Sequence, residues 1–253
     1  MKNSREFESI EFMGLSGAGK SFHHRKVLEN LQSNRNYPAY DLQRSVQSSF
    51  LTEKFNTRNS LVETLGRLRR YKYRVTRGTV KDYNKFAAEN PELIQTCIEG
   101  ITRRSESQFQ KEYALNKMFW TFSNYQTLLD RSYQGLLFMD EGFIQKGATM
   151  FCDHQEMMGK HAEKYIERIS LPDKVVWIKA DKQKCLETMK GRERGFPERI
   201  KKLKQNEKKE FLDNLEKYFE IVIQVLNKRN AEIIEIENSW NDDSVSKIKE
   251  GLL

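Results

Sequence analysis

The sequence predicts an α/β protein, a three-layer sandwich in which helices cover both faces of a central parallel β-sheet. Two observations carry this prediction. Short apolar runs alternate with long polar segments in which apolar residues recur every three or four positions. Strands that alternate with helices form parallel sheets, because each helix returns the chain to the same end of the sheet. The clearest strand candidates are Ile10–Leu15, Gly135–Asp140, Lys174–Ala180 and Ala231–Ile236.

Helical segments follow these strands in order along the chain. The first strand candidate precedes a helical stretch, Phe22–Gln32, and a weaker strand candidate, Tyr37–Asp41. A second long helix is predicted for residues 197–230, and a short one for Asp242–Leu253. The apolar stripe of the long helix has alternating spacings of four and three. It comprises Phe211, Leu215, Tyr218, Val222 and Val225.

Residues 46–130 differ from the rest of the chain. They contain no convincing strand, and their leucine, phenylalanine and tyrosine residues recur at helical spacing. Asn90-Pro91 marks a turn or a helix start within them. We therefore expect a single domain over residues 1–253, with a large all-helical insertion at residues 46–130.

The charge balance favours anionic partners. Lys and Arg number 44 and Asp and Glu number 36, which gives a net charge of +8. Nucleotides, sugar phosphates, nucleic acid and anionic membrane surfaces all suit such an excess, so charge alone does not choose among them. The 38% share of apolar residues is too high for a disordered chain.

The cysteines and the N-terminus predict a cytoplasmic protein. Cys97, Cys152 and Cys185 are odd in number and lack metal-binding spacing, which favours reduced thiols. The first residues lack the apolar core of a secretory signal. No stretch reaches the ~18 apolar residues that a membrane-spanning helix needs. We expect no transmembrane segment.

The most specific motif is the octapeptide GLSGAGKS at residues 14–21, which matches G-x-x-x-x-G-K-[ST]. It lies between a predicted strand and a predicted helix, as a phosphate-binding loop requires. Glycines let successive backbone N–H groups point at phosphate oxygens, and the helix start adds its positive end. Lys20 would contact the β- and γ-phosphates, and Ser21 would bind Mg²⁺. The predicted nucleotide-binding residues are Gly14, Ser16, Gly17, Ala18, Gly19, Lys20 and Ser21.

Two acidic residues end the next clear strand. Asp140 and Glu141 directly follow the apolar run Leu136–Met139. In a parallel sheet, the carboxyl end of a central strand opens onto the same edge as the phosphate loop. We expect Asp140 to hold Mg²⁺ and Glu141 to act as general base toward an acceptor hydroxyl or a water.

A basic segment follows the third clear strand. Residues 190–205 include Arg192, Arg194 and Arg199, together with Gly191 and Gly195. Glycines permit a hinge, and guanidinium groups bind phosphate, so the segment is predicted to be a closing lid. Arg192 and Arg194 are candidates for stabilising the transferring phosphoryl group, and Arg199 is a candidate nucleotide contact.

The motifs GLSGAGKS and FMDEG, together with the run VVWIKADKQKCLETMKGRERG, resemble P-loop small-molecule kinases of the thymidylate kinase and deoxynucleoside kinase group. The resemblance implies the P-loop NTPase fold, with ATP and Mg²⁺ as nucleotide and metal. It also implies that Asn238 and Ser239, after the last strand, lie near the base of ATP. Those kinases usually carry Asp-Arg where this chain has Asp140-Glu141, and residues 46–130 lie outside the resemblance.

The insertion contains a basic stretch with three open interpretations. It holds six basic residues and two tyrosines within residues 67–77. It is a solvated helix face, a site for an anionic acceptor, or a nucleic-acid contact, the last being the least favoured. Asp41 and Arg44, after the second strand, are candidate acceptor ligands because they would face the same crevice.

These residues support three functional hypotheses. The first is a kinase that transfers the γ-phosphoryl group of ATP to a small acceptor such as a nucleoside, nucleotide or sugar. The second is a P-loop ATPase that acts as a switch on a partner. The third is an enzyme acting on polynucleotide or polysaccharide partners. Oligomeric state and the identity of the acceptor stay open.

Overall fold

The computed structural model describes residues 7–33, 39–42, 79–103, 107–130, 135–152, 155–193, 195–238 and 242–252. Its centre is a five-stranded, fully parallel sheet with strand order β2-β3-β1-β4-β5. The predicted strands, including the weaker second one, are therefore confirmed, with ends displaced by up to three residues. The strands are β1 (Phe7–Gly14), β2 (Ala39–Asp41), β3 (Gly135–Met139), β4 (Lys174–Lys179) and β5 (Glu232–Glu237).

The strand order creates a crevice between the carboxyl ends of β1 and β3. These strands are neighbours, with Glu11 in register with Met139. The chain leaves β1 toward the β2 edge of the sheet and leaves β3 toward the β4 edge. Connections that depart in opposite directions from adjacent strands leave a gap above the strand ends, where ligands of α/β proteins bind.

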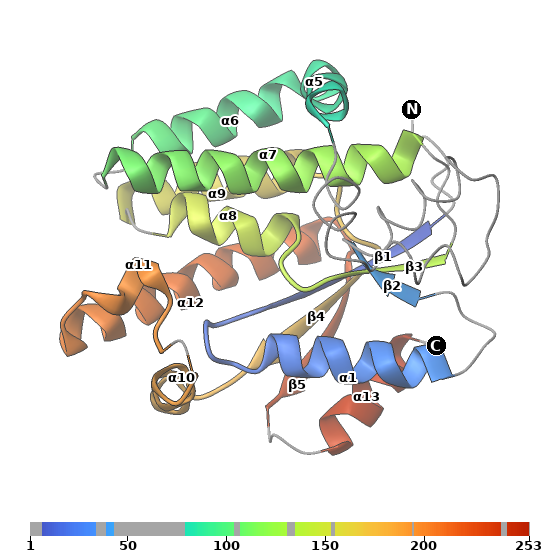
Figure 1. Cartoon of the computed structure of the whole chain (residues 1–253), viewed down its shortest axis with the longest axis vertical. Coiled ribbons are helices and arrows are strands. Elements are labelled where there is room, and N and C mark those ends of the chain that lie inside the picture. Colours follow the sequence, from blue (N-terminus) through green and yellow to red (C-terminus); the bar gives the residue numbers. More distant parts are fainter. Residues whose placement is uncertain are drawn as a thin grey trace.

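Helices cover both faces of the sheet (Figure 1). One face carries α1 (Lys20–Ser33) and α13 (Asp242–Leu252), which pack on each other. The opposite face carries α7 (Gln108–Asp130), α8 (Phe143–Phe151), α9 (Gln155–Arg168) and α12 (Gln205–Lys228). The three-layer sandwich expected from the sequence is therefore confirmed. Two short helices, α10 (Lys182–Lys190) and α11 (Glu198–Lys201), follow β4.

The apolar stripe of the long C-terminal helix lies in the core as predicted. Leu215, Tyr218, Val222 and Val225 are all at most 2% exposed. The central strand β1 is buried along almost its whole length, because helices cover it from both sides. That burial places the loop after β1 on a rigid support.

The described part of the predicted insertion is helical. Besides α7 it contains α5 (Val80–Glu89) and α6 (Pro91–Thr102), and α6 packs on α7, α8 and α9. The side chain of Thr79 accepts the Asp82 amide and caps α5, while Pro91 occupies the first turn of α6, where no amide donor is needed. Residues 43–78, which hold the basic stretch, lie outside the described residues. The boundaries of the insertion and of the lid stay predictions.

Candidate active site

The phosphate loop (Gly14–Ser21) adopts a conformation that only glycine accommodates easily at three positions. Gly14, Gly17 and Gly19 have φ values of 146°, 90° and 89°. A Cβ atom on Gly17 would lie 2.3 Å from the carbonyl oxygen of Cys185. The loop is therefore pressed against the first turns of α10, and its shape depends on the glycines that the motif specifies.

Backbone and side-chain contacts hold the loop open toward the crevice. The Lys20 ammonium group donates to the carbonyl oxygens of Gly14 and Leu15, each at 2.9 Å. The Asn238 side-chain amide, just beyond β5, donates to the carbonyl of Ala18 at 2.7 Å. Within the described ranges, the amides of Gly17 and Gly19 donate to no acceptor. These donors are available to phosphate oxygens.

The two residues predicted to bind Mg²⁺ lie together. The hydroxyl of Ser21, at the start of α1, is 3.1 and 2.9 Å from the two carboxylate oxygens of Asp140. Asp140 directly follows β3, so the contact joins the carboxyl ends of the two strands that flank the crevice. Residues 119 positions apart in the sequence thus form one oxygen-rich corner beside the phosphate loop.

Glu141 lies in a cluster of lysines. Its carboxylate forms an ion pair with the ammonium group of Lys146, on α8. Burial raises the pKa of Glu141, but the charges of Lys146, Lys20 and Lys117 outweigh it, and the pKa falls below its usual range. Glu141 is therefore ionised at neutral pH, with a side chain that is 57% exposed at the crevice.

Lys20 is surrounded by groups that influence its charge. Burial lowers the pKa of Lys20 from its ordinary value, while the carboxylates of Glu141 and Asp140 raise it in part. Arg192 lowers the same pKa, so its guanidinium lies near enough to act on the loop lysine. Among the described residues, Arg192 is thus the predicted lid arginine whose charge influences Lys20.

The lid segment contains one backbone conformation that favours glycine. Gly195 has a φ of 66°, whereas Gly191 ends α10 with an ordinary right-handed conformation. The Gly195 amide donates to the carbonyl of Arg192 at 2.8 Å, which closes a turn around that arginine. Of the two glycines expected to permit a hinge, Gly195 has a backbone conformation that favours glycine and Gly191 does not. The hinge motion itself stays a prediction.

Five predicted site residues lie wholly or in part outside the described residues, and one of them is Ser239. Arg44 and Arg194 lie outside the described residues, and so do the side chains of Asp41 and Arg199, although Asp41 ends β2 and Arg199 belongs to α11. Their roles stay predictions.

Sequence reasoning missed a buried carboxylate beneath the crevice. Glu11, in the middle of β1, is fully buried, and its two oxygens accept the amides of Ile144 and Gln145 at 3.1 and 2.8 Å. Burial raises the pKa of Glu11 to about 7, although these amides and Lys146 lower it in part. A lone acidic residue within the apolar run after Ile10 was the available signal, because charged groups are rarely buried without a partner.

Glu11 belongs to a polar network that fixes the start of α8. Gln145 accepts the Gly14 amide at 3.3 Å, so α8 is tied to the phosphate loop. The hydroxyls of Tyr165 and Tyr218 donate to the carbonyls of Phe143 and Ile144 at 2.7 and 2.8 Å. The network orients α8 and with it Lys146, the partner of Glu141.

Fold and loop together define the class of the protein, which has the P-loop NTPase fold with its phosphate loop at the topological switch point of the sheet. No protein-family model matches the sequence, and no curated protein matches it. Within the described residues, no helix is both long enough and apolar enough to cross a membrane.

Solved structures that align with nearly the whole chain include three proteins with TM-scores below 0.5. A deoxyadenosine kinase from M. mycoides with bound dATP has 12% identity and a TM-score of 0.48, over 97% of this chain and 98% of that chain. A shikimate kinase from Bacteroides thetaiotaomicron has 15% identity and a TM-score of 0.36, over 97% and 98%. The protein TT1252 from Thermus thermophilus has 13% identity and a TM-score of 0.35, over 97% and 95%. Likeness at this level identifies neither substrate nor activity.

Proposed function

We propose that this protein is a phosphotransferase that moves the γ-phosphoryl group of ATP to a small acceptor. The observation that carries the proposal is the contact of the Ser21 hydroxyl with the Asp140 carboxylate, at 2.9 Å, beside the phosphate loop. A loop hydroxyl and a strand-end carboxylate are the two protein oxygen donors that a nucleotide-bound Mg²⁺ uses in P-loop enzymes.

The residues present fit Mg²⁺. This ion prefers oxygen ligands and is usually bound through one or two carboxylates together with substrate phosphates. Ser21 and Asp140 supply two oxygen ligands at the edge of the loop, where the phosphates would supply the others. When bound, the ion neutralises the charge that develops on the phosphate oxygens.

The remaining residues have separate roles in the transfer. Lys20 would leave the carbonyls of Gly14 and Leu15 and donate to the β- and γ-phosphate oxygens. A bond forms between the acceptor oxygen and the γ-phosphorus, while the bond from that phosphorus to the bridging oxygen breaks and ADP leaves. Glu141, ionised and 57% exposed, would take the hydroxyl proton.

The test separates the two carboxylates. ATP consumption is measured with a panel of nucleosides, nucleotides and sugars, and the products are weighed by mass spectrometry. Asp140→Asn should lose activity that higher Mg²⁺ partly restores, because it weakens the metal side. Glu141→Gln should bind ATP normally and lower transfer by about 10²-fold or more. Glu220→Gln, an exposed site on α12, is the matched control and should change nothing.

The result also separates kinase from switch. Hydrolysis of ATP that depends on Lys20 but phosphorylates no acceptor, and that a macromolecular partner stimulates, would contradict the kinase proposal in favour of a switch. Full activity of Glu141→Gln with every acceptor would remove Glu141 from the mechanism.

A further inference from the structure

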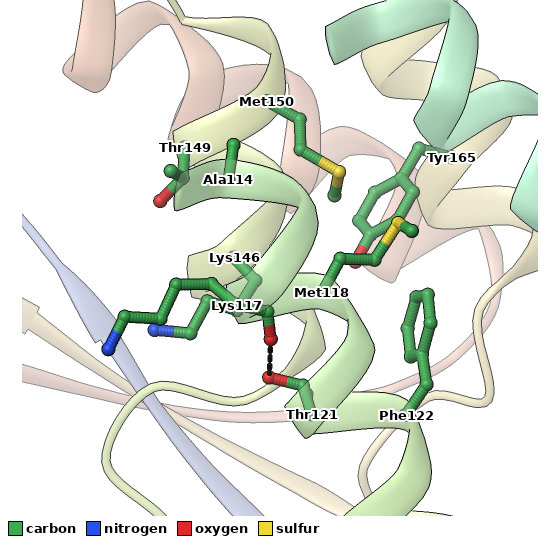
Figure 2. Close-up of a pocket in the computed structure, with 9 residues that line it drawn as sticks. All are labelled: Ala114, Lys117, Met118, Thr121, Phe122, Lys146, Thr149, Met150 and Tyr165. Carbon is green, nitrogen blue, oxygen red and sulfur yellow. Dashed lines mark hydrogen bonds between the residues drawn. The ribbon is translucent and has the colours of Figure 1, made fainter. Parts of the chain in front are cut away.

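A small cavity opens between α7 and α8, next to Glu141. The empty space there is about 260 Å³, a value that includes open solvent, so the enclosed part is much smaller. Figure 2 shows Lys117 and Lys146 extending to one side of it, away from the sulfur atoms of Met118 and Met150. The cavity thus has a basic side and an apolar side. Its lining residues also include Ala114, Thr121, Phe122, Thr149 and Tyr165.

The basic side of this α7–α8 cavity carries more positive than negative charge. Lys146 is paired with Glu141, whereas Lys117, within the described part of the chain, forms no ion pair and lies 5.3 Å from the centroid of the Tyr113 ring. Lys117 and Lys146 both line the cavity, and Lys146 is the one that pairs with the Glu141 carboxylate. A nucleotide bound to the loop would occupy Lys20, which leaves two lysines around one carboxylate.

The position of Lys146 is held by the structure. Lys146 belongs to the first turn of α8, whose amides are held by Glu11 and whose carbonyls accept the hydroxyls of Tyr165 and Tyr218. Lys117 is fixed at its backbone by the Thr121 hydroxyl, which donates to its carbonyl at 2.9 Å (Figure 2). Two ammonium groups on two packed helices are the kind of donor pair that binds a small anion.

We propose that the acceptor carries an anionic group, a carboxylate or a phosphate, that binds between Lys117 and Lys146 beside Glu141. This inference rests on the proposed function, because it names the acceptor class of the same site. The anion replaces part of the Lys146–Glu141 pairing and frees the Glu141 carboxylate to face the acceptor hydroxyl.

The first test measures anion binding without any turnover. Inorganic phosphate and acetate are titrated, in separate experiments, into protein saturated with Mg²⁺ and a non-hydrolysable ATP analogue, and residue-resolved NMR shifts are followed. Shifts on α7 and α8 should saturate. Lys117→Gln should weaken phosphate or acetate binding about tenfold or more, because a hydrogen bond to a charged group is lost.

Matched variants keep this test interpretable. Lys117→Arg keeps the charge and should bind the anion nearly as well as the wild type. Lys247→Gln removes an exposed lysine from α13, across the sheet, and should leave the anion affinity unchanged. Thermal melts show whether each variant is folded. No saturable shift on α7 or α8, or unchanged affinity in folded Lys117→Gln, would overturn the inference.

The second test compares acceptors that differ in one charged group. Glucose is compared with glucose 6-phosphate and glucuronate, and nucleosides are compared with their 5′-monophosphates. The charged member of a pair should have a kcat/KM at least about tenfold higher, and Lys117→Gln should raise its KM with less effect on kcat. Preference for phosphate or for carboxylate members identifies which anion is used.

Different results contradict the anionic-acceptor inference and the proposed function. Neutral acceptors phosphorylated as efficiently as their charged counterparts would overturn the anionic-acceptor inference and leave the kinase proposal intact. Saturable phosphate binding at α7 and α8, with transfer to no acceptor, would support the anion site and count against the proposed function.

Discussion

The two halves of the crevice present different chemical groups, backbone amides on one side and charged side chains on the other. The phosphate loop presents backbone amides in a conformation set by Gly14, Gly17 and Gly19, and it carries one charged side chain, Lys20. The α7–α8 side presents side-chain charges, with Lys117 and Lys146 around a carboxylate. One half depends on backbone conformation and the other on which side chains tertiary packing brings together.

This difference decides how each half responds to substitution. A backbone site changes when a Cβ atom is added or the loop shifts, whereas most of its side chains can vary. A side-chain site changes charge when a lysine is replaced by a neutral residue but keeps its shape, as long as the network under α8 holds. The backbone side is thus set by the fold, and the side-chain side is the one that substitution can adjust.

The largest effect is expected at the one charged side chain of the loop. Lys20→Ala should lower turnover by about 10²–10³-fold, or about 3–4 kcal/mol, because it removes a preorganised charge from the phosphoryl group. The fold should survive, because the Lys20 ammonium contacts only loop carbonyls. Lys26→Ala, on the same helix, is the control. Wild-type ATP turnover in purified Lys20→Ala would contradict the assignment of the loop.

The loop was predictable from sequence and the α7–α8 side was not. Gly14–Ser21 form a contiguous motif whose geometry follows from eight residues, and Asp140 was found because it ends an apolar run. Lys117 and Lys146 carry no such pattern, since a lysine on a helix is ordinarily a solvated surface residue. Their proximity depends on how α7 and α8 pack, which short-range spacing does not encode. The one sequence signal for Glu11 was a charged residue within a run predicted to be a buried strand.

The second prediction tests the network that holds the side-chain half in place. The pKa of Glu11 is raised from 4.5 to about 7. The folded state therefore binds more protons than the unfolded state between these values. The proton on Glu11 stabilises the folded state fully below pH 4.5. The free energy of unfolding then declines by about 3 kcal/mol as the pH rises through 7. Urea unfolding from pH 5 to 8 should show this decline.

Glu11→Gln provides the comparison. Its carboxamide has one oxygen, so one of the two α8 amides loses its acceptor, and the variant should be less stable at pH 5 by about 1–3 kcal/mol. The difference in unfolding free energy between Glu11→Gln and the wild type should narrow toward pH 8. Burial lowers the pKa of His23, which acts in the opposite direction but equally in both proteins. If this difference in unfolding free energy stays constant from pH 5 to 8, Glu11 ionises with an ordinary pKa.

The third prediction targets the backbone half. Gly17→Ala places a Cβ atom 2.3 Å from the Cys185 carbonyl oxygen at a φ of 90°. It should reduce stability by about 1–3 kcal/mol and weaken nucleotide binding about tenfold, because either the loop or α10 must move. Gly159→Ala, on α9, meets nothing within 4 Å and should stabilise the protein by about 0.5–1 kcal/mol. Thermal unfolding and nucleotide titration measure both effects.

The fourth prediction concerns the predicted lid. Arg192 is exposed, yet its charge acts on Lys20 from a turn closed by the Gly195 amide. We predict that the segment closes over bound nucleotide and brings the guanidinium to the transferring phosphoryl group, excluding water so that the acceptor reacts. Arg192→Ala should then lower transfer about 10- to 30-fold and change ATP affinity by less than about threefold, because the contact strengthens only during transfer.

Calorimetry for ATP affinity and mass spectrometry for product separate these two quantities, with Arg25→Ala on the exposed side of α1 as the control. A large loss of ATP affinity with unchanged transfer at saturating ATP would mean that Arg192 only docks the nucleotide. Arg192 would then belong functionally to the phosphate-loop side of the crevice. A loss confined to transfer would instead make Arg192 the link between the two halves, since it would act only when both substrates are present.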